Sequence, residues 1–213
     1  MSQNDETDGT QRRLENLFPN RDECASFYTK GYPEENCWHL LNDKLDKIES
    51  ISLDHFYVLF ISNEKRQVLL FKEESGEGIV IDYHAVIIGK IDNQIFVFDF
   101  DFPIDFPTSL DHYSQNILKN DNNNNDIPGP YRRKYRIVET SVFLHNFVTN
   151  RCHMKSKSNG DWLMPPPRQP CIVGSKSNCH HNLHHFTDMS QTKYGVILDD
   201  SLHLLSFFQN HLH

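Results

Sequence analysis

The chain has 213 residues, of which 38% are hydrophobic, and its 21 basic and 29 acidic residues give a net charge of −8 at pH 7. This length and apolar content suit one domain with one core. The acidic balance lacks the basic footprint of a nucleic-acid binder, and no stretch approaches the roughly 18 apolar residues of a membrane span. We therefore expect neither a nucleic acid nor a membrane as a partner.

Cysteine content and local composition indicate the cellular compartment and the number of domains. The five cysteines are an odd number and are scattered along the chain. The polar N-terminus lacks the apolar segment of a secretory signal, so we expect a cytoplasmic or nuclear location with free thiols. Residues 1–20 predict a flexible polar tail, and the Asn-rich run 121–126 predicts a solvated loop. No Gly/Ser-rich linker divides the remainder, so we expect residues 21–213 to form a single domain.

A helix is predicted to begin near Tyr32. Pro33, Glu34 and Glu35 follow, and they suit a first turn. Proline needs no N–H at the first helical position, and acidic residues favour the positive end of the helix dipole. Apolar residues then recur at helical spacing, which predicts a buried stripe. The stripe consists of Cys37, Leu40, Leu41, Leu45 and Ile48.

Four runs rich in β-branched and aromatic residues follow the helix and are separated by polar turns. They span residues 56–61, 67–71, 79–89 and 94–102. Short helices are expected over 141–150 and 201–212. The order of these elements predicts an α+β fold, in which an N-terminal helix packs on an antiparallel meander.

Two polar residues stand in the otherwise apolar hairpin formed by the last two strands. If Gly89 and Gln94 are the last pair before a four-residue turn, His84 lies directly opposite Asp99. Opposed Cβ atoms are about 4.5–5.5 Å apart, close enough for a carboxylate to bind an imidazole N–H and fix its tautomer. Because polar groups in apolar strands are costly unless paired, the pattern is typical of a catalytic base and its orienter. A satisfied polar pair on an exposed face is the alternative.

Two other clusters could carry chemistry. Cys171 and the tract 179–185 (Cys-His-His-Asn-Leu-His-His) contain metal-ligand residue types, but no CxxC or HExxH spacing is present. We interpret the tract as a His-rich surface loop and expect no metal, with zinc binding as the alternative. The basic run 131–136 predicts a strand with a solvated basic face rather than an anion or RNA site. No Gly-rich phosphate loop is present, and we expect no cofactor.

Several further segments, taken in their order from about Asp22 to the C-terminus, form a recognisable series. Residues 32–38 read Tyr-Pro-Glu-Glu-Asn-Cys-Trp and residues 81–85 read Ile-Asp-Tyr-His-Ala. The series also includes 58–64, Phe98-Asp99-Phe100-Asp101, Phe106-Pro107, 132–136, His153-Met154-Lys155, Trp162 and 165–172. In this order the segments resemble the eukaryotic protein N-terminal glutamine amidohydrolase family. That family has a Tyr-Cys-Glu-Glu-Asn-x-Trp segment and a Trp-Asp-Tyr-His-Val signature.

The resemblance implies a papain-like cysteine-hydrolase core, a monomer and a Cys-His-Asp triad without a cofactor. Its reaction deamidates the side chain of an N-terminal glutamine to Glu and releases ammonia, a step of the N-degron pathway. The partners it implies are proteins or peptides with a free N-terminal glutamine. His84 and Asp99 match the family's catalytic histidine and aspartate, the same two residues that the hairpin places together.

The resemblance puts the family's nucleophilic cysteine on Pro33, which has no nucleophile. Cys37 lies one turn further, roughly 6 Å along the helix axis, and its place in the apolar stripe predicts a core residue. A substitute nucleophile at Cys37, or at Cys24, is the alternative. Two hypotheses follow, an N-terminal glutamine amidohydrolase and a non-catalytic relative that binds N-terminal glutamine peptides. Glu34 and Glu35 are interpreted as helix-dipole acids, with binding of the substrate's α-ammonium group as the alternative.

Overall fold

The computed structural model describes residues 21–49, 56–91, 94–119, 127–177 and 180–210. The predicted tail and the Asn-rich run therefore lie outside the described residues. The centre is a six-stranded antiparallel sheet in the order β6-β5-β4-β1-β7-β8, and β2 and β3 form a separate two-stranded sheet. The strands are β1 (Phe56–Ser62), β2 (Val68–Phe71), β3 (Gly78–Ile81), β4 (His84–Ile91), β5 (Gln94–Phe98), β6 (Thr108–Ser109), β7 (Lys134–Glu139) and β8 (Val196–Leu198).

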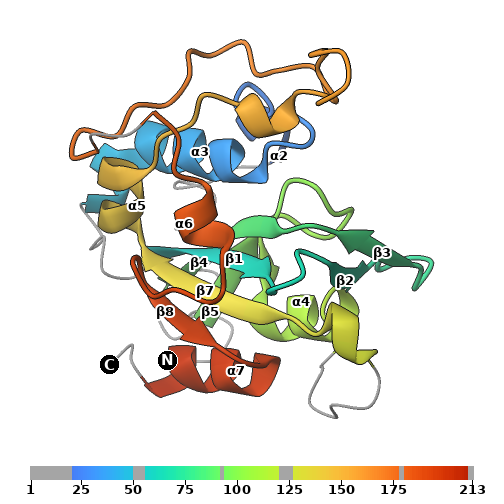
Figure 1. Ribbon diagram of the computed structural model, residues 1–213. Coiled ribbons are helices and arrows are strands. Elements are labelled where there is room, and N and C mark those ends of the chain that lie inside the picture. Colours follow the sequence, from blue (N-terminus) through green and yellow to red (C-terminus); the bar gives the residue numbers. More distant parts are fainter. Residues whose placement is uncertain (1–20, 50–55, 92–93, 120–126, 178–179, 211–213) are drawn as a thin grey trace.

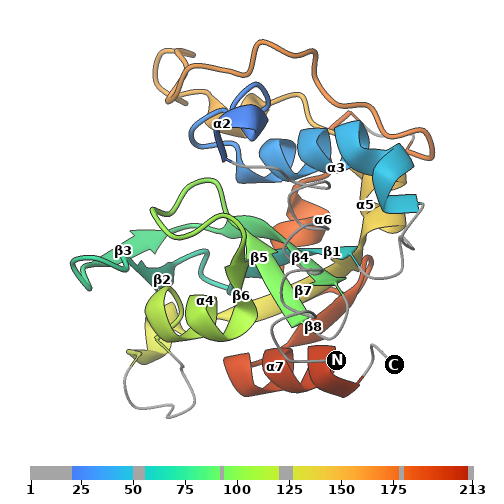
Figure 2. The ribbon, with the colours of Figure 1, turned by 180° about the vertical axis from the view of Figure 1, so that it is seen from behind.

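Helices cover both faces of the central sheet, as Figures 1 and 2 show from opposite sides. One face carries α3 (Pro33–Glu49), α5 (Thr140–Asn146) and α6 (His184–Thr187), and the other carries α4 (Leu110–Asn116) and α7 (Ser201–Asn210). The short elements are α2 (Arg21–Cys24), η2 (Gly129–Tyr131) and η3 (Cys152–Met154). This arrangement confirms the α+β class and the N-terminal helix. No helix within the described ranges is long and apolar enough to cross a membrane.

Two hydrophobic cores sandwich the sheet because the central strand alternates between them. In β1, Val58 and Phe60 face the core under α3, whereas Leu59 and Ile61 face the core over α4 and α7. All four side chains are fully buried, and each contributes about 1.5–3 kcal/mol relative to exposure. The sheet is therefore packed on both faces. This packing fixes the positions of the strand ends at which polar residues gather.

The meander prediction is correct only in part. The predicted strand 79–89 is broken at Asp82, whose carbonyl accepts a hydrogen bond from the Ser62 hydroxyl at 3.0 Å and whose Oδ1 accepts the Tyr83 N–H at 3.1 Å. These bonds take the backbone out of the ladder. As a result β2 and β3 form their own hairpin, and β4 pairs with β1.

The predicted register of the next hairpin is wrong by two residues. Ile91 pairs with Gln94, so Ile88 lies opposite Val97 rather than Ile95. The reason is that Ile91 is buried and continues β4 instead of entering a four-residue turn. A shift of two residues keeps every side chain on its expected face, because side chains alternate with a period of two.

The basic run 131–136 leads into a strand, as predicted, but its solvated face is wrong. Arg133 and Arg136 are both fully buried. Arg136 donates to the carbonyl oxygens of Phe186 (2.9 Å) and Asp188 (2.6 Å), and Arg133 donates to that of Leu69 (3.0 Å). Long-range carbonyl acceptors, which the local pattern does not contain, draw these side chains inward.

The remaining helices follow the sequence more closely. The helix predicted over 141–150 is α5, which ends at Asn146 because Phe147 is extended. The predicted closing helix is α7, and the last three residues of the chain lie outside the described ranges. Local sequence patterns do not predict α4, α6, β6 or β8.

Candidate active site

His84 is the first residue of β4 and lies at the end of the sheet, fully enclosed by protein. Its Nε2 is 2.8 Å from the Oδ2 of Asp99, and the hydroxyl of Tyr113 donates to the same oxygen at 2.8 Å. The other oxygen of Asp99 accepts the backbone N–H groups of Asp101 (2.9 Å) and Phe102 (3.3 Å). The predicted contact between His84 and Asp99 is confirmed, and every oxygen of the carboxylate is satisfied.

The surroundings of this pair favour its charged form. Burial alone would lower the pKa of His84, but the carboxylates of Asp99 and then Asp101 outweigh it and raise that pKa. Burial would likewise raise the pKa of Asp99, yet His84 and the hydrogen bonds from Asp101 and Tyr113 lower it. An imidazole held by a carboxylate in this way has one tautomer and one orientation.

Because Asp99 holds Nε2, Nδ1 is the ring nitrogen that stays outside this pair. The Nδ1 of His84 is 3.9 Å from the Oδ2 of Asp101. Asp101 in turn forms a side-chain hydrogen bond with Tyr28, in the loop that precedes α3. Arg21 clamps the Asp101 loop by donating to the carbonyl oxygens of Asp99 (3.1 Å) and Phe102 (3.0 Å). The segment before α3 is thus tied directly to the His84 site.

The first turn of α3 is the second part of the site. Pro33 opens the helix and is buried, and Gly31 before it has a φ of 82°, which a residue without a Cβ adopts at least cost. The hydroxyl of Tyr83 donates to Oε2 of Glu34 at 2.6 Å. Since Tyr83 directly precedes His84, this bond joins the start of α3 to the start of β4.

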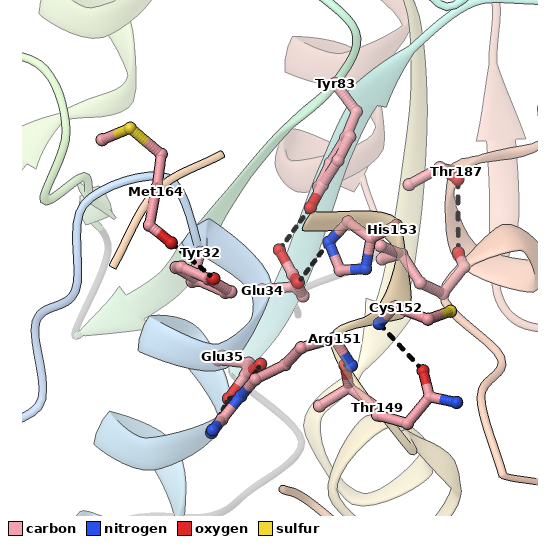
Figure 3. A network of polar contacts seen from close by, with 12 residues as sticks. Tyr32, Glu34, Glu35, Tyr83, Thr149, Arg151, Cys152, His153, Met164 and Thr187 are labelled. Carbon is pink, nitrogen blue, oxygen red and sulfur yellow. Dashed lines mark hydrogen bonds and ion pairs between the residues drawn. The ribbon is translucent and has the colours of Figure 1, made fainter. Parts of the chain in front are cut away.

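Glu35, the next residue, forms a buried ion pair with Arg151 (Figure 3). The Nη2 and Nε of Arg151 lie 2.7 and 2.9 Å from the two carboxylate oxygens. Arg151 also donates to the carbonyl of Gln169 at 2.9 Å, in the segment after the three consecutive prolines. Charge pairing therefore fixes the long segment 150–170 over the N-terminal end of α3.

Comparison with known proteins identifies the family. Residues 28–208 match the model of the family described as N-terminal glutamine amidase. The chain is 37% identical over 184 residues to the protein N-terminal glutamine amidohydrolase of Bos taurus, covering 84% of each chain. It is 37% identical to that of Homo sapiens over 175 residues (80% of this chain and 81% of the relative). The corresponding Danio rerio protein is 32% identical over 186 residues (85% and 88%). The chain belongs to the N-terminal glutamine amidase family.

Within this amidase family member, the thiols near the site are not activated. Cys37 is only 2% exposed, and burial, followed by the charges of Asp99 and Asp101, raises its pKa well above the ordinary value. Burial also raises the pKa of Cys24. Cys152 and Cys171 are free and exposed. Cys37 packs in the core under α3, as its place in the apolar stripe predicts.

The His-rich tract leads into α6, whose first two residues are His184 and His185. Cys179 lies outside the described residues. His181 stacks on His153 with ring centroids 5.5 Å apart, and His184 is exposed. In the part of the chain that the structure describes, no group of three or more His, Cys, Asp or Glu side chains could hold a metal ion.

The sequence alone assigns no role to three residues of the site: Tyr113, Arg151 and His153. Tyr113 lies on α4, a helix too short to show a clear period. Arg151 is expected only once Glu35 is known to be buried, because a buried carboxylate requires a cationic partner. His153 has no signal of this kind outside the family resemblance.

Proposed function

We propose that this chain acts on the N-terminal glutamine of proteins, in a site built to hydrolyse the side-chain carboxamide to a carboxylate and release ammonia. The observation that carries the proposal is His84, held through Nε2 by the buried Asp99 and tied to the first turn of α3. Family membership supports the substrate, since the relatives are named protein N-terminal glutamine amidohydrolases.

The fold belongs to the same proposal. A helix whose first turn meets a histidine at the start of a central strand is the layout of a papain-like cysteine hydrolase. We take residues 21–213 as one domain of this kind, acting as a monomer. The two cores on either side of one sheet support this.

The chemistry is that of a Cys-His-Asp site. A thiolate attacks the carboxamide carbon, and backbone N–H groups stabilise the negative oxygen. The imidazolium of His84 gives a proton to the departing nitrogen, so the C–N bond breaks, ammonia leaves and a thioester remains. His84 then takes a proton from water, and the hydroxide hydrolyses the thioester to a carboxylate and the free thiol. Nδ1 is the atom that moves these protons, because Asp99 occupies Nε2.

Position 33 decides whether this chain can hydrolyse the substrate, because the family resemblance places the nucleophile there and proline supplies none. Cys37 is the substitute candidate, but it is sealed in the core with a raised pKa. It also lies roughly 6 Å further along the axis, whereas attack fails with errors near 1 Å. Pro33 thus favours a second candidate function, the binding of N-terminal glutamine without turnover.

Ammonia release from a Gln-initiated peptide tests both functions on three chains. We expect the Pro33→Cys chain to be at least about a thousandfold faster than the natural chain, as expected for a triad that regains its nucleophile. A natural chain that is silent but binds the peptide supports the second function. A natural chain that turns over and is abolished by Cys37→Ser supports a displaced nucleophile. A folded Pro33→Cys chain that neither binds nor hydrolyses the peptide overturns the proposal.

A further inference from the structure

The two acidic residues of the first turn of α3 have opposite surroundings (Figure 3). Glu35 is bound on both oxygens by Arg151. Glu34 is equally buried, and its Oε2 accepts the Tyr83 hydroxyl, but its Oε1 has no hydrogen-bond partner among the described residues. Nε2 of His153 lies 3.7 Å from Oε1, beyond hydrogen-bond distance.

No described cation balances Glu34. The titratable groups around it are Tyr83, His153, Glu35 and Asp82. Burial lowers the pKa of His153 to about 4, so this ring is neutral at pH 7. Burial raises the pKa of Glu34 to about 8, opposed by the hydrogen bond from Tyr83. Buried carboxyl groups in folded proteins are normally paired or fully hydrogen-bonded, so an open oxygen here is a place for a cationic ligand.

We propose that Oε1 of Glu34 receives the α-ammonium group of the substrate's N-terminal residue. This rests on the proposed function, and it makes Glu34 the residue that distinguishes an N-terminal glutamine from an internal one. Glu34 directly follows position 33, and neighbouring Cα atoms are about 3.8 Å apart. The short side chain of glutamine separates its α-ammonium from its carboxamide carbon, so one turn of α3 can hold the first while the second meets position 33.

The side chain of His153 covers Oε1 of Glu34, the proposed binding site for the ammonium. It lies over Oε1, is 17% exposed, and neither ring nitrogen has a hydrogen-bond partner in the described ranges. Its ring is held by stacking on His181 rather than by polar bonds. Rotation of the ring away from Glu34 therefore breaks no hydrogen bond and opens the oxygen to an incoming ammonium.

The carboxylate of Glu34 explains why a free N-terminal glutamine binds in preference to an internal or acetylated one. An α-ammonium gives Glu34 a charge-assisted hydrogen bond and a counter-charge in a buried place, where both are strong. An internal glutamine, or an acetylated N-terminus, offers a neutral amide, so Glu34 keeps its proton and gains no counter-charge.

Calorimetric binding of two peptides to the full chain tests this. The probes are a Gln-Ala-Ala amide with a free N-terminus and the same peptide acetylated at Nα. The natural chain should bind the free peptide at least about tenfold more tightly than the acetylated one, the factor expected for a hydrogen bond to a charged group. Glu34→Gln retains the shape and an acceptor for Tyr83, and it should reduce the preference to less than about twofold.

The matched control is Asp105→Asn. It removes one negative charge from an exposed residue that does not belong to the titratable groups named around Glu34, and it should keep the natural preference. A second readout is the proton balance, obtained by repeating the titration at pH 7 in buffers of different ionisation enthalpy. The natural chain should release up to about one proton as Glu34 gives up its own proton to pair with the ammonium. Glu34→Gln should release none.

The outcomes separate the two proposals. Equal binding of free and acetylated peptides by the natural chain, or a preference that survives Glu34→Gln, overturns the role of Glu34 and leaves glutamine recognition standing. Binding of neither peptide overturns the proposed function itself. Circular dichroism of Glu34→Gln shows whether the variant is folded, and the acetylated peptide measures its remaining binding.

Discussion

Two buried polar clusters meet at this site, and they differ in how completely their hydrogen bonds are satisfied. Around Asp99, each carboxylate oxygen has partners: His84 and Tyr113 on one, two backbone N–H groups on the other. Around Glu34, one oxygen is bound by Tyr83 and the other is open. A closed cluster holds a group in place, whereas an open one has the capacity to bind something else.

The difference assigns different tasks to the two ends of one site. Asp99 orients His84, so its geometry must not change during a reaction. Glu34 meets a ligand that comes and goes, so one oxygen stays unfilled at a cost to stability. Glu35 lies beside Glu34 on the same turn and shows that the fold can supply a guanidinium where it needs one.

The largest effect on folding is expected from the paired acid. Arg151→Met leaves Glu35 buried without a counter-charge and should lower the free energy of unfolding by about 3–5 kcal/mol in urea titrations. Adding Glu35→Gln should restore much of the loss, because the unpaired charge is then gone. Arg168→Met, an exposed arginine in the same segment, is the control and should change little. Similar losses for both arginine variants would show that the ion pair is unimportant.

Replacing Glu34, the acid with one open oxygen, should raise the free energy of unfolding rather than lower it. Because its pKa is raised to about 8 in the folded chain, Glu34 binds more protons folded than unfolded between about pH 4.3 and 8. Its contribution to stability is therefore lost as pH rises through that range. Glu34→Gln should be more stable than the natural chain at pH 8 by about 2 kcal/mol or more, and the gain should disappear near pH 4. An equal change at both pH values would contradict the raised pKa.

The smallest effect is expected within the closed cluster. Tyr113→Phe removes one hydrogen bond to Asp99 and should cost about 1 kcal/mol at pH 7. Asp99 has a lowered pKa in the folded chain, so its contribution is present above about pH 3.9 and is lost as pH falls further. The loss should therefore shrink in acid. Tyr131→Phe, on the half-buried η2 turn, is the matched control.

The sequence predicts the His84–Asp99 contact despite a wrong register, because a slip of two residues leaves both side chains on the same face. The register itself depends on whether Ile91 enters the core or the turn, and local pattern does not decide this. The break at Asp82 likewise depends on a hydrogen bond from Ser62, twenty residues earlier.

What the sequence cannot give are partners that only the fold brings close. Arg133 and Arg136 look like solvated strand residues until distant carbonyl groups surround them. Arg151 reaches Glu35 across 116 positions, and Tyr113 reaches Asp99 from a helix that shows no clear pattern. Local periodicity predicts elements and faces, and long-range polar contacts need the structure.

The most direct measurement is ammonia release by the Pro33→Cys chain, alone and with Asp99→Asn added. If His84 and Asp99 form a working acid-base couple beside position 33, Pro33→Cys exceeds the natural chain by at least about a thousandfold. Asp99→Asn should then reduce that rate by about 10³–10⁴, while Asp105→Asn, an exposed acid in the same loop, leaves it unchanged. A folded Pro33→Cys chain that binds the peptide and releases no more ammonia than the natural chain would contradict this, as would a rate that ignores Asp99→Asn.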